Sequence, residues 1–268
     1  MNMNQAAKGP FLQACNRQAV RRVPIWLMRQ AGRYMKEYRE LRAKHSMLEI
    51  CKSAKLCAEV TLQPIKAFEL DAAILFTDLL MPLEAMGADL EYAKGEGPVI
   101  HNPVRNLEDA KRLKLIDPQK GLPYLYESIG LTRSLLDADI PLIGFGGAPF
   151  TMASYLIEGG HSSHFAATKS MMYGQPKTWK LLMNKIVDVM AACLQAQVRA
   201  GVQALQIFDS WIGSLSMEDY REFILPHSKR LLSEISGKGA PVIHFGTGNP
   251  ELYPLMKQAG GDVLGVDW

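Results

Sequence analysis

The stretch PLIGFGGAPF (residues 141–150) places a short, almost unbroken apolar run directly before a glycine pair and a proline. An apolar run of this length, bounded by turn residues, is typical of a strand that is buried on both faces of a parallel sheet. Four further runs share the pattern, and a fifth is weaker. They are DAAILF (71–76), ALQIF (204–208), PVIHF (241–245) and VLGV (263–266), with PIWLM (24–28) as the weaker one.

Segments with helical spacing alternate with these runs. The clearest is 178–200, where apolar residues recur every three or four positions. Residues 219–225 and 228–235 predict further helix, interrupted at Pro226. Alternating strands and helices indicate an α/β protein with a parallel sheet, either an open doubly wound sheet or a closed barrel.

The residues that follow each predicted strand favour the barrel. Asp78, Ala148, Asp209 with Ser210, and Gly246 each come directly or almost directly after an apolar run. In a (β/α)8 barrel the carboxyl ends of the strands carry the active site. No GxGxxG stands at the first strand–helix junction and no GxxxxGK[ST] occurs, which argues against the nucleotide-binding open sheets.

We therefore predict one (β/α)8 TIM-type barrel domain over residues 1–268. It is expected to be incomplete, because the sequence stops just after a strand and only five confident strands are found. A barrel that lacks its last strands and helices leaves two unpaired edges.

Composition narrows the function classes. The hydrophobic share of 48% and charged share of 21% are ordinary for a soluble globular protein, and the net charge of +3 gives no indication of a nucleic-acid partner. No run approaches the length of a membrane helix, and the N-terminus lacks the apolar core of a signal peptide. The four cysteines form no CxxC pair. We expect a cytoplasmic protein without a membrane or nucleic-acid partner.

The motif MRQAGRY (28–34) contains two arginines, Arg29 and Arg33, four positions apart. This spacing returns side chains to one face in a helix and also in a strand, so the two guanidinium groups can converge on a carboxylate or phosphate. Gly32 permits close approach of a ligand to the backbone. From the spacing alone, a solvated basic face extended by Lys36, Arg39 and Arg42 is the favoured explanation.

Asp78 in LFTDLLMP has two readings of equal weight. A carboxylate between apolar neighbours can accept converging N–H donors or stabilise developing positive charge. It can also cap the next helix.

Two further strand ends offer hydrogen-bonding groups. Thr151 and Tyr155 share a helix face after residue 148, where Tyr155 is either a ligand contact or an ordinary core residue. Ser210 can donate to a substrate, or Asp209 and Ser210 merely turn the chain and cap the helix near Met217.

The histidines give weaker signals. His244 is more typical of a satisfied core residue than of a ligand. His161 and His164 lack partners at metal-ligand spacing and are expected in a loop, so no metal site is predicted.

Taken together, the sequence resembles the uroporphyrinogen decarboxylase family from residue 10 onward. The stretches that carry the resemblance are WLMRQAGRYMKEYRELR (26–42), CAEVTLQPIKAFELDAAILFTDLL (57–80), GEGPVIHNPV (95–104), PLIGFGGAPFTMASYLIEGG (141–160), QALQIFDSWIG (203–213) and VLGVDW (263–268). Members of the family continue beyond the equivalent of Trp268 into a segment with an NLGHG-like motif, so this chain is expected to be a fragment whose own activity is in doubt.

The resemblance implies a cofactor-independent barrel enzyme, usually a homodimer. Such an enzyme converts the four acetate groups of uroporphyrinogen III to methyls and gives coproporphyrinogen III. It implies that Asp78 and Arg29 are catalytic, Asp78 as the acceptor of the pyrrole N–H groups. It also implies that Arg29, Gln30, Ala31, Gly32, Arg33, Asp78, Tyr155 and Ser210 contact the substrate.

Two alternatives remain. One is a catalytically inactive tetrapyrrole-binding fragment. The other is a corrinoid-linked, zinc-dependent methyltransferase of the same fold, which is less favoured because Gly246 stands where a His-x-Cys motif needs its thiolate.

Overall fold

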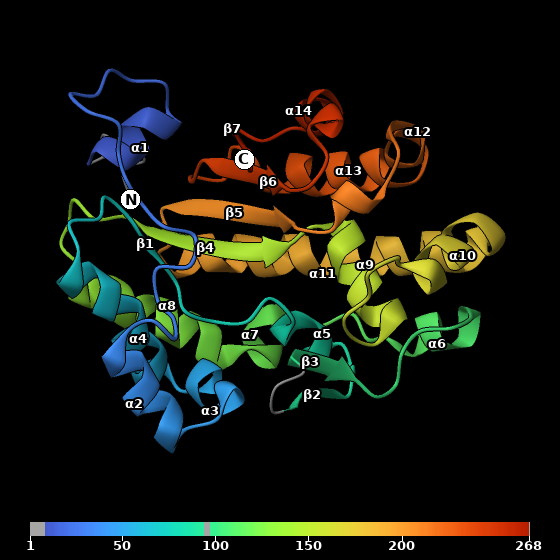
Figure 1. Cartoon of the computed structure of the whole chain (residues 1–268), viewed down its shortest axis with the longest axis horizontal. Helices are drawn as coiled ribbons and strands as arrows, with labels where there is room; N and C mark the ends of the chain where they lie inside the picture. The colour runs from blue at the N-terminus through green and yellow to red at the C-terminus, as the bar shows by residue number, and fades with distance from the viewer. Residues whose placement is uncertain (1–8, 94–96, 268) are drawn as a thin grey trace.

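A computed structural model describes residues 9–93 and 97–267 (Figure 1). Five parallel strands form one sheet in the order β1-β4-β5-β6-β7. They are β1 (Ala73–Ile74), β4 (Leu142–Gly147), β5 (Ala204–Asp209), β6 (Val242–Gly246) and β7 (Val263–Gly265). All five confident strand predictions are confirmed. Among the described residues no strand connects β7 to β1, so the sheet is open, as expected of an incomplete barrel.

The residues outside this description include two parts of the sequence that carried predictions. Residues 1–8, where no signal peptide is expected, and Gly95, Glu96 and Trp268, which belong to matched stretches, lie outside the described residues.

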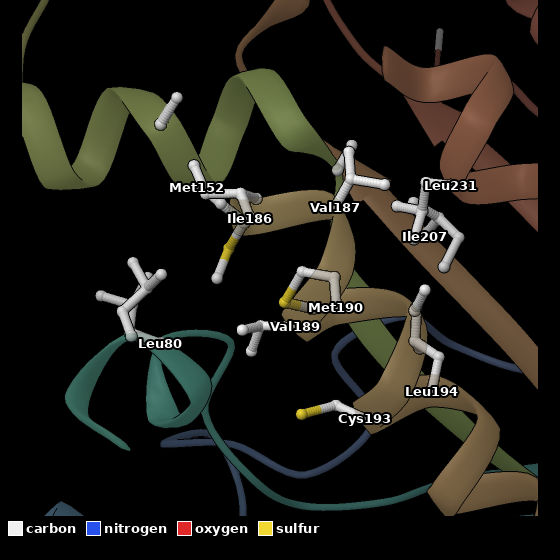
Figure 2. Close-up of a cluster of buried hydrophobic side chains, with 14 of the residues drawn as sticks. Leu80, Met152, Ile186, Val187, Val189, Met190, Cys193, Leu194, Ile207 and Leu231 are labelled. Atoms are coloured by element: carbon white, nitrogen blue, oxygen red, sulfur yellow. The ribbon is translucent and has the colours of Figure 1, made fainter. Parts of the chain in front are cut away.

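Helices cover the outer face of the sheet. The largest are α4 (Ala54–Ala67), α8 (Pro123–Leu135), α9 (Pro149–Glu158), α11 (Pro176–Ala200) and α13 (Leu225–Ile235), and the short α14 (Tyr253–Ala259) packs against α13. Figure 1 shows α11 running behind β4. Figure 2 shows side chains of α11 (Ile186, Met190) meeting Met152 of α9, Ile207 of β5 and Leu231 of α13. This layer is the main hydrophobic core.

Shorter elements connect these layers. They are α1 (Pro10–Cys15), α2 (Lys36–Lys44), α3 (Met47–Lys52), α5 (Met81–Ala85), α6 (Leu107–Arg112), α7 (Pro118–Gly121), α10 (Ala166–Gly174) and α12 (Met217–Asp219), with 3₁₀ turns at Ile212–Ser214 and Pro250–Leu252. An antiparallel hairpin of β2 (Leu90–Ala93) and β3 (Gly97–Ile100) was not predicted.

Alternate strand residues face the inside of the open barrel. Ile143, Ala204 and Ile243 form a second small core with Phe11 and Leu12 of α1. The strand residues between them face the helices, because successive side chains of a strand point to opposite faces of the sheet. This alternation decides which residues of each strand end reach a site inside the barrel.

Glycines of β4 bring α11 close to the sheet. A Cβ on Gly146 would stand 2.7 Å from Cε of Met190, and one on Gly144 would stand 2.4 Å from Oε1 of Gln197. The Gln197 amide accepts from the Phe145 N–H (3.0 Å) and donates to the Phe145 carbonyl (2.8 Å). The close packing of α11 against β4 therefore requires glycine at positions 144 and 146 of the GFGG sequence.

Helix α11 is long and apolar enough, by composition, to cross a membrane, and it alone passes that test in the described part of the chain. Its most apolar window is 61% buried inside the protein. That burial is typical of the core helix of a soluble protein.

Two predictions about elements are wrong. Residues 24–28 form no strand; Ile25 instead exchanges hydrogen bonds with Asp71, its N–H donating to the carboxylate (2.6 Å) and its carbonyl accepting from the backbone N–H (2.7 Å). Nor does Pro226 interrupt a helix. A π-helical turn at Tyr220–Ile224 runs straight into α13, near whose start Pro226 lies. The wider turn accommodates a residue that lacks an N–H.

Candidate active site

A cleft of about 710 Å³ opens at the carboxyl ends of the strands. Segments that are far apart in the sequence contribute to it: residues 28–31, the end of β1 with residues 75–79, and the ends of β4, β5 and β6. Its polar lining includes Arg29, Asp78, Tyr155, Ser210 and Thr247. Of the residues predicted to follow the strands, Asp78 and Ser210 line this cleft, whereas Ala148, Asp209 and Gly246 are not among its lining residues.

Three phenylalanines from neighbouring strands line the inner side of the cleft. Phe145 of β4 meets Phe208 of β5 edge to face, with ring centroids 5.5 Å apart, and Phe208 meets Phe245 of β6 in the same way at 6.0 Å. Edge-to-face rings pack firmly without strong polarity. The cleft therefore combines an apolar wall with a few polar groups, as small-molecule sites do.

Arg29 is exposed and lines the cleft, and its loop is held by its neighbour. Gln30 is only 1% exposed. Its side-chain oxygen accepts from the Leu27 N–H (3.2 Å) and its amide nitrogen donates to the Ala72 carbonyl (3.2 Å) at the start of β1. Both polar groups of the Gln30 side chain are therefore hydrogen-bonded within the protein, and only the Gln30 backbone can contact a ligand.

Arg39 holds the other end of this loop. Its guanidinium donates to the carbonyls of Arg33 and Tyr34, both at 2.9 Å. The Tyr34 hydroxyl in turn donates to the Gln30 carbonyl. One of the cations attributed to a solvated face is therefore used to shape the loop.

The Arg29–Arg33 argument holds only in part. Residues 28–35 form turns and bends, so a spacing of four does not bring the two side chains to one face. Ala31 lines the cleft, whereas Gly32 and the exposed Arg33 are not among its lining residues.

An ion pair fastens the segment before this loop. The Arg22 guanidinium donates to both carboxylate oxygens of Asp71, at 2.6 and 2.7 Å, and Asp71 is 5% exposed. Burial disfavours the charged carboxylate, but hydrogen bonds from Arg22 and the Ile25 N–H outweigh it and hold the pKa of Asp71 below its usual value. Nothing in the spacing of the sequence pointed to this pair.

Asp78 is half-buried at the edge of the cleft, and its Oδ1 accepts from the Leu80 N–H at 2.8 Å. Burial raises the pKa of its carboxyl, while the nearby Tyr92 hydroxyl and the Leu80 N–H act in the opposite direction. Both readings of Asp78 apply in modified form. It lines the cleft and also closes the turn before α5, although the N-cap of that helix is Leu80.

Tyr155 lines the same cleft as Arg29 and Asp78, and the charges of both act on its hydroxyl. Burial and the Asp78 charge raise the pKa of Tyr155 to about 12, against an opposing effect of Arg29. Its ring stacks on Trp211, with centroids 4.0 Å apart. Tyr155 is thus a cleft residue, and its hydroxyl is an un-ionised donor at neutral pH.

Trp211 and Tyr92 were missed by sequence reasoning. Trp211 stood in the quoted DSWIG motif, directly after Ser210, so its position was available as a signal. Tyr92 lies on the β2 strand of the unpredicted hairpin, and its hydroxyl is buried beside Asp78.

Ser210 lines the cleft, and its carbonyl accepts from the Thr247 hydroxyl at 2.8 Å. The alternative that Asp209 and Ser210 cap the helix near Met217 is wrong, because Ser216 caps it. Asp209 and His244 point to the helix side of the sheet. His161 and His164 lie in a loop, and within residues 9–93 and 97–267 no three His, Cys, Asp or Glu side chains gather as a metal site.

The fold and cleft define a barrel-type enzyme that acts from the carboxyl ends of parallel strands. The chain belongs to the uroporphyrinogen decarboxylase family, whose model, described as uroporphyrinogen decarboxylase (URO-D), matches residues 6–268. It is 55% identical to a uroporphyrinogen decarboxylase of Sorangium cellulosum over 96% of this chain and 74% of the relative. It is 49% identical to one of Thermus thermophilus over 96% of this chain and 75% of the relative.

The fold is also found among solved structures. A methyltransferase from Methanosarcina mazei superposes with a TM-score of 0.77 over 95% of this chain and 74% of that chain, at 20% identity. At this identity the likeness concerns the fold alone.

Proposed function

We propose that this chain decarboxylates the acetate side chains of uroporphyrinogen III to methyls and so forms coproporphyrinogen III. One observation carries the proposal: Arg29, Asp78 and Tyr155 meet in a single cleft with an aromatic wall. Membership of the family and relatives that bear this name at 49–55% identity support it.

The substrate is a large polycarboxylate with four pyrrole N–H donors. Arg29 binds the carboxylate that will leave, because a guanidinium matches that group geometrically and electrostatically. Asp78 accepts the pyrrole N–H groups, which turns the macrocycle toward it. Tyr155, Ser210 and the backbone of Gln30–Gly32 donate to the remaining carboxylates, and Arg33 binds those at the mouth.

The reaction needs no separate electron acceptor. A proton adds to a ring carbon and makes the pyrrole cationic; the bond to the carboxylate breaks, CO₂ leaves, and its electron pair neutralises the ring. The resulting exocyclic methylene takes a second proton to become the methyl group, and loss of the first restores the pyrrole. Asp78 lowers the energy of the cationic intermediate, because its negative charge lies in the cleft where the positive charge develops.

Asp78→Asn tests this role most directly. The amide still accepts from the Leu80 N–H but carries no charge, so we expect kcat to fall by a factor on the order of 10²–10³ while the fold is kept. Turnover is followed by chromatography of the oxidised products, in the chain extended through the C-terminal quarter of the Sorangium relative. Glu91→Gln, at an exposed hairpin position, is the matched control. A normal kcat in Asp78→Asn contradicts the assignment.

Arg29→Ala and Arg33→Ala separate the two arginines. We expect Arg29→Ala to lower kcat/KM about 10- to 100-fold, because a charge-assisted hydrogen bond is lost. Arg33→Ala should have a smaller effect, mainly on KM, since Arg33 does not line the cleft. Equal losses would instead indicate that the two side chains act as a pair.

We further propose a cytoplasmic homodimer built from one domain per chain, by resemblance to the family. Light scattering of the extended chain decides between monomer and dimer. The methyltransferase alternative has no added support, because no cysteine is among the residues that line the cleft.

A further inference from the structure

A buried acid and imidazole lie directly behind the cleft, on the opposite face of the sheet. Asp209 and His244 are both 0% exposed, and Oδ2 of Asp209 is 3.9 Å from Nε2 of His244. They occupy neighbouring strands, β5 and β6, close to the ends that carry Ser210 and Thr247.

This pair is costly for the fold. Within the described part of the chain, Oδ2 of Asp209 and both ring nitrogens of His244 make no hydrogen bond. Burial raises the pKa of Asp209, against the opposing effects of His244 and Thr151. The same strand face is otherwise apolar, with Leu205 and Ile207 of β5. Apolar residues would pack there at lower cost, so the polar pair is hard to explain by stability.

A chain of contacts links the pair to the cleft. The Thr151 hydroxyl, at the start of α9, donates to Oδ1 of Asp209 at 3.1 Å and accepts from the Trp211 N–H at 3.4 Å. Trp211 stacks on Tyr155, which lies one helical turn after Thr151. Both aromatic residues line the cleft.

Other polar groups face the pair from the helix layer. Tyr220 of the π-helical turn is fully buried, and burial together with the Asp209 charge raises the pKa of its hydroxyl. Ser228 of α13 lies beside that hydroxyl. The wide turn before α13 therefore places a further polar group against the end of β5.

We infer that Asp209, His244 and Thr151 are positioning residues, which set the Trp211–Tyr155 side of the cleft from behind the sheet. The His244 ring packs beside Oδ2 of Asp209, Asp209 orients the Thr151 hydroxyl through its other oxygen, and Thr151 fixes the Trp211 backbone relative to α9. None of the three is among the residues that line the cleft. The catalytic consequence rests on the proposed function, whereas the geometric one does not.

The test uses Asp209→Asn and Thr151→Val, which keep the size of each side chain. The melting temperature of each variant is measured together with two readouts. The first is the near-ultraviolet circular dichroism of Trp211, obtained by subtracting the spectrum of Trp211→Phe from that of the parent protein. The second is the affinity for uroporphyrin, measured from its fluorescence. We expect both variants to lose much of the Trp211 signal and to bind uroporphyrin about tenfold more weakly, because the stacked wall shifts. Thr151→Val removes only a hydroxyl and serves if Asp209→Asn does not fold.

Thr168→Val is the matched control. Thr168 is equally buried, and its hydroxyl donates to Glu158 at 2.8 Å. We expect it to lower the melting temperature without changing either readout. If Asp209→Asn and Thr151→Val behave like this control, the positioning role is refuted. If the wild type binds no uroporphyrin, the result argues against tetrapyrrole binding in this cleft and so against the proposed function, and the Trp211 signal alone decides on the positioning role.

Discussion

At the scale of single residues, the arginine loop depends on a carboxylate that the motif does not contain. Asp71 receives two hydrogen bonds from Arg22 and one from the Ile25 N–H. We expect Asp71→Asn to lower the free energy of unfolding by about 1–3 kcal/mol at pH 7, since charge-assisted bonds to a buried group are lost. Chemical denaturation measures the loss. Asp89→Asn, where the carboxylate makes no such contacts among the described residues, should be nearly neutral.

The pH dependence of this difference has a definite sign. The pKa of Asp71 is lower in the folded protein than its ordinary value, which is about 3.9. Its stabilisation is therefore complete above that ordinary pKa and decreases as the pH falls below it, through the folded pKa. Wild type and Asp71→Asn should converge in stability at the acid end of a series from pH 6 to pH 2.5. A difference that is constant over the series contradicts the role of the charge.

The sequence predicted many cleft residues but not how they are held. Arg29, Asp78, Tyr155 and Ser210 could be singled out because each follows a strand or stands in a matching motif. The clamps on the arginine loop could not, since Gln30 binds Ala72 and Arg22 binds Asp71 across more than forty residues of chain. Local spacing also did not predict that the loop with Arg29 and Arg33 is neither helix nor strand.

At the scale of elements, β4 and α11 are fitted to each other through the glycines. We expect Gly146→Ala to destabilise the fold by about 1–3 kcal/mol, because the added methyl meets Met190 and Leu194 in a closed core. Gly130→Ala is the control of opposite sign. It lies in α8 with nothing within 4 Å of its Cβ, so alanine should stabilise by about 0.5–1 kcal/mol. Similar losses in both variants would show that packing against α11 is not the cause.

Three of the strands that the sequence predicted, β4, β5 and β6, are buried on both faces, where continuous apolar runs are required, whereas β7 is half-buried. The β2–β3 hairpin escaped because LEYA and GPVI are short and only partly apolar. Residues 24–28 have a strand-like pattern but no strand beside them among the described residues; their partner is the Asp71 side chain and backbone. Whether a segment pairs with a neighbouring strand depends on the tertiary structure, so the composition of the segment alone does not predict it.

At the scale of the whole molecule, the open sheet leaves apolar surface uncovered. Val23, Ile25 and Leu27 point outward from one extended segment and are 80%, 53% and 48% exposed, and Val266 after β7 is 55% exposed. A second cavity of about 480 Å³, with a largely apolar lining, opens between α1 and the inner face of β6 and β7. Contiguous apolar surface of this kind promotes association.

We therefore expect the 268-residue polypeptide to bind the dye ANS and to self-associate. Val23→Thr with Ile25→Thr should reduce dye fluorescence, and extension with the C-terminal quarter of the Sorangium relative should reduce it further. Leu135→Thr, at a 57% exposed position on α8, is the control and should have little effect. Dye binding that is absent in the parent chain, or unchanged by these alterations, would show that the segment and cavity are already covered.

The arginine loop is held mainly by side chains, and it is therefore a candidate site of proteolysis. Residues 28–35 have no ladder or helical hydrogen bonds of their own, and they present Arg29 and Arg33 on exposed, irregular backbone. Trypsin cuts after such residues once a segment can open locally. A ligand that engages Arg29 holds the loop closed, so the rate of cleavage there reports occupancy of the cleft. We therefore expect an anionic ligand that engages Arg29 in the cleft to slow tryptic cleavage there, whether or not the ligand is turned over.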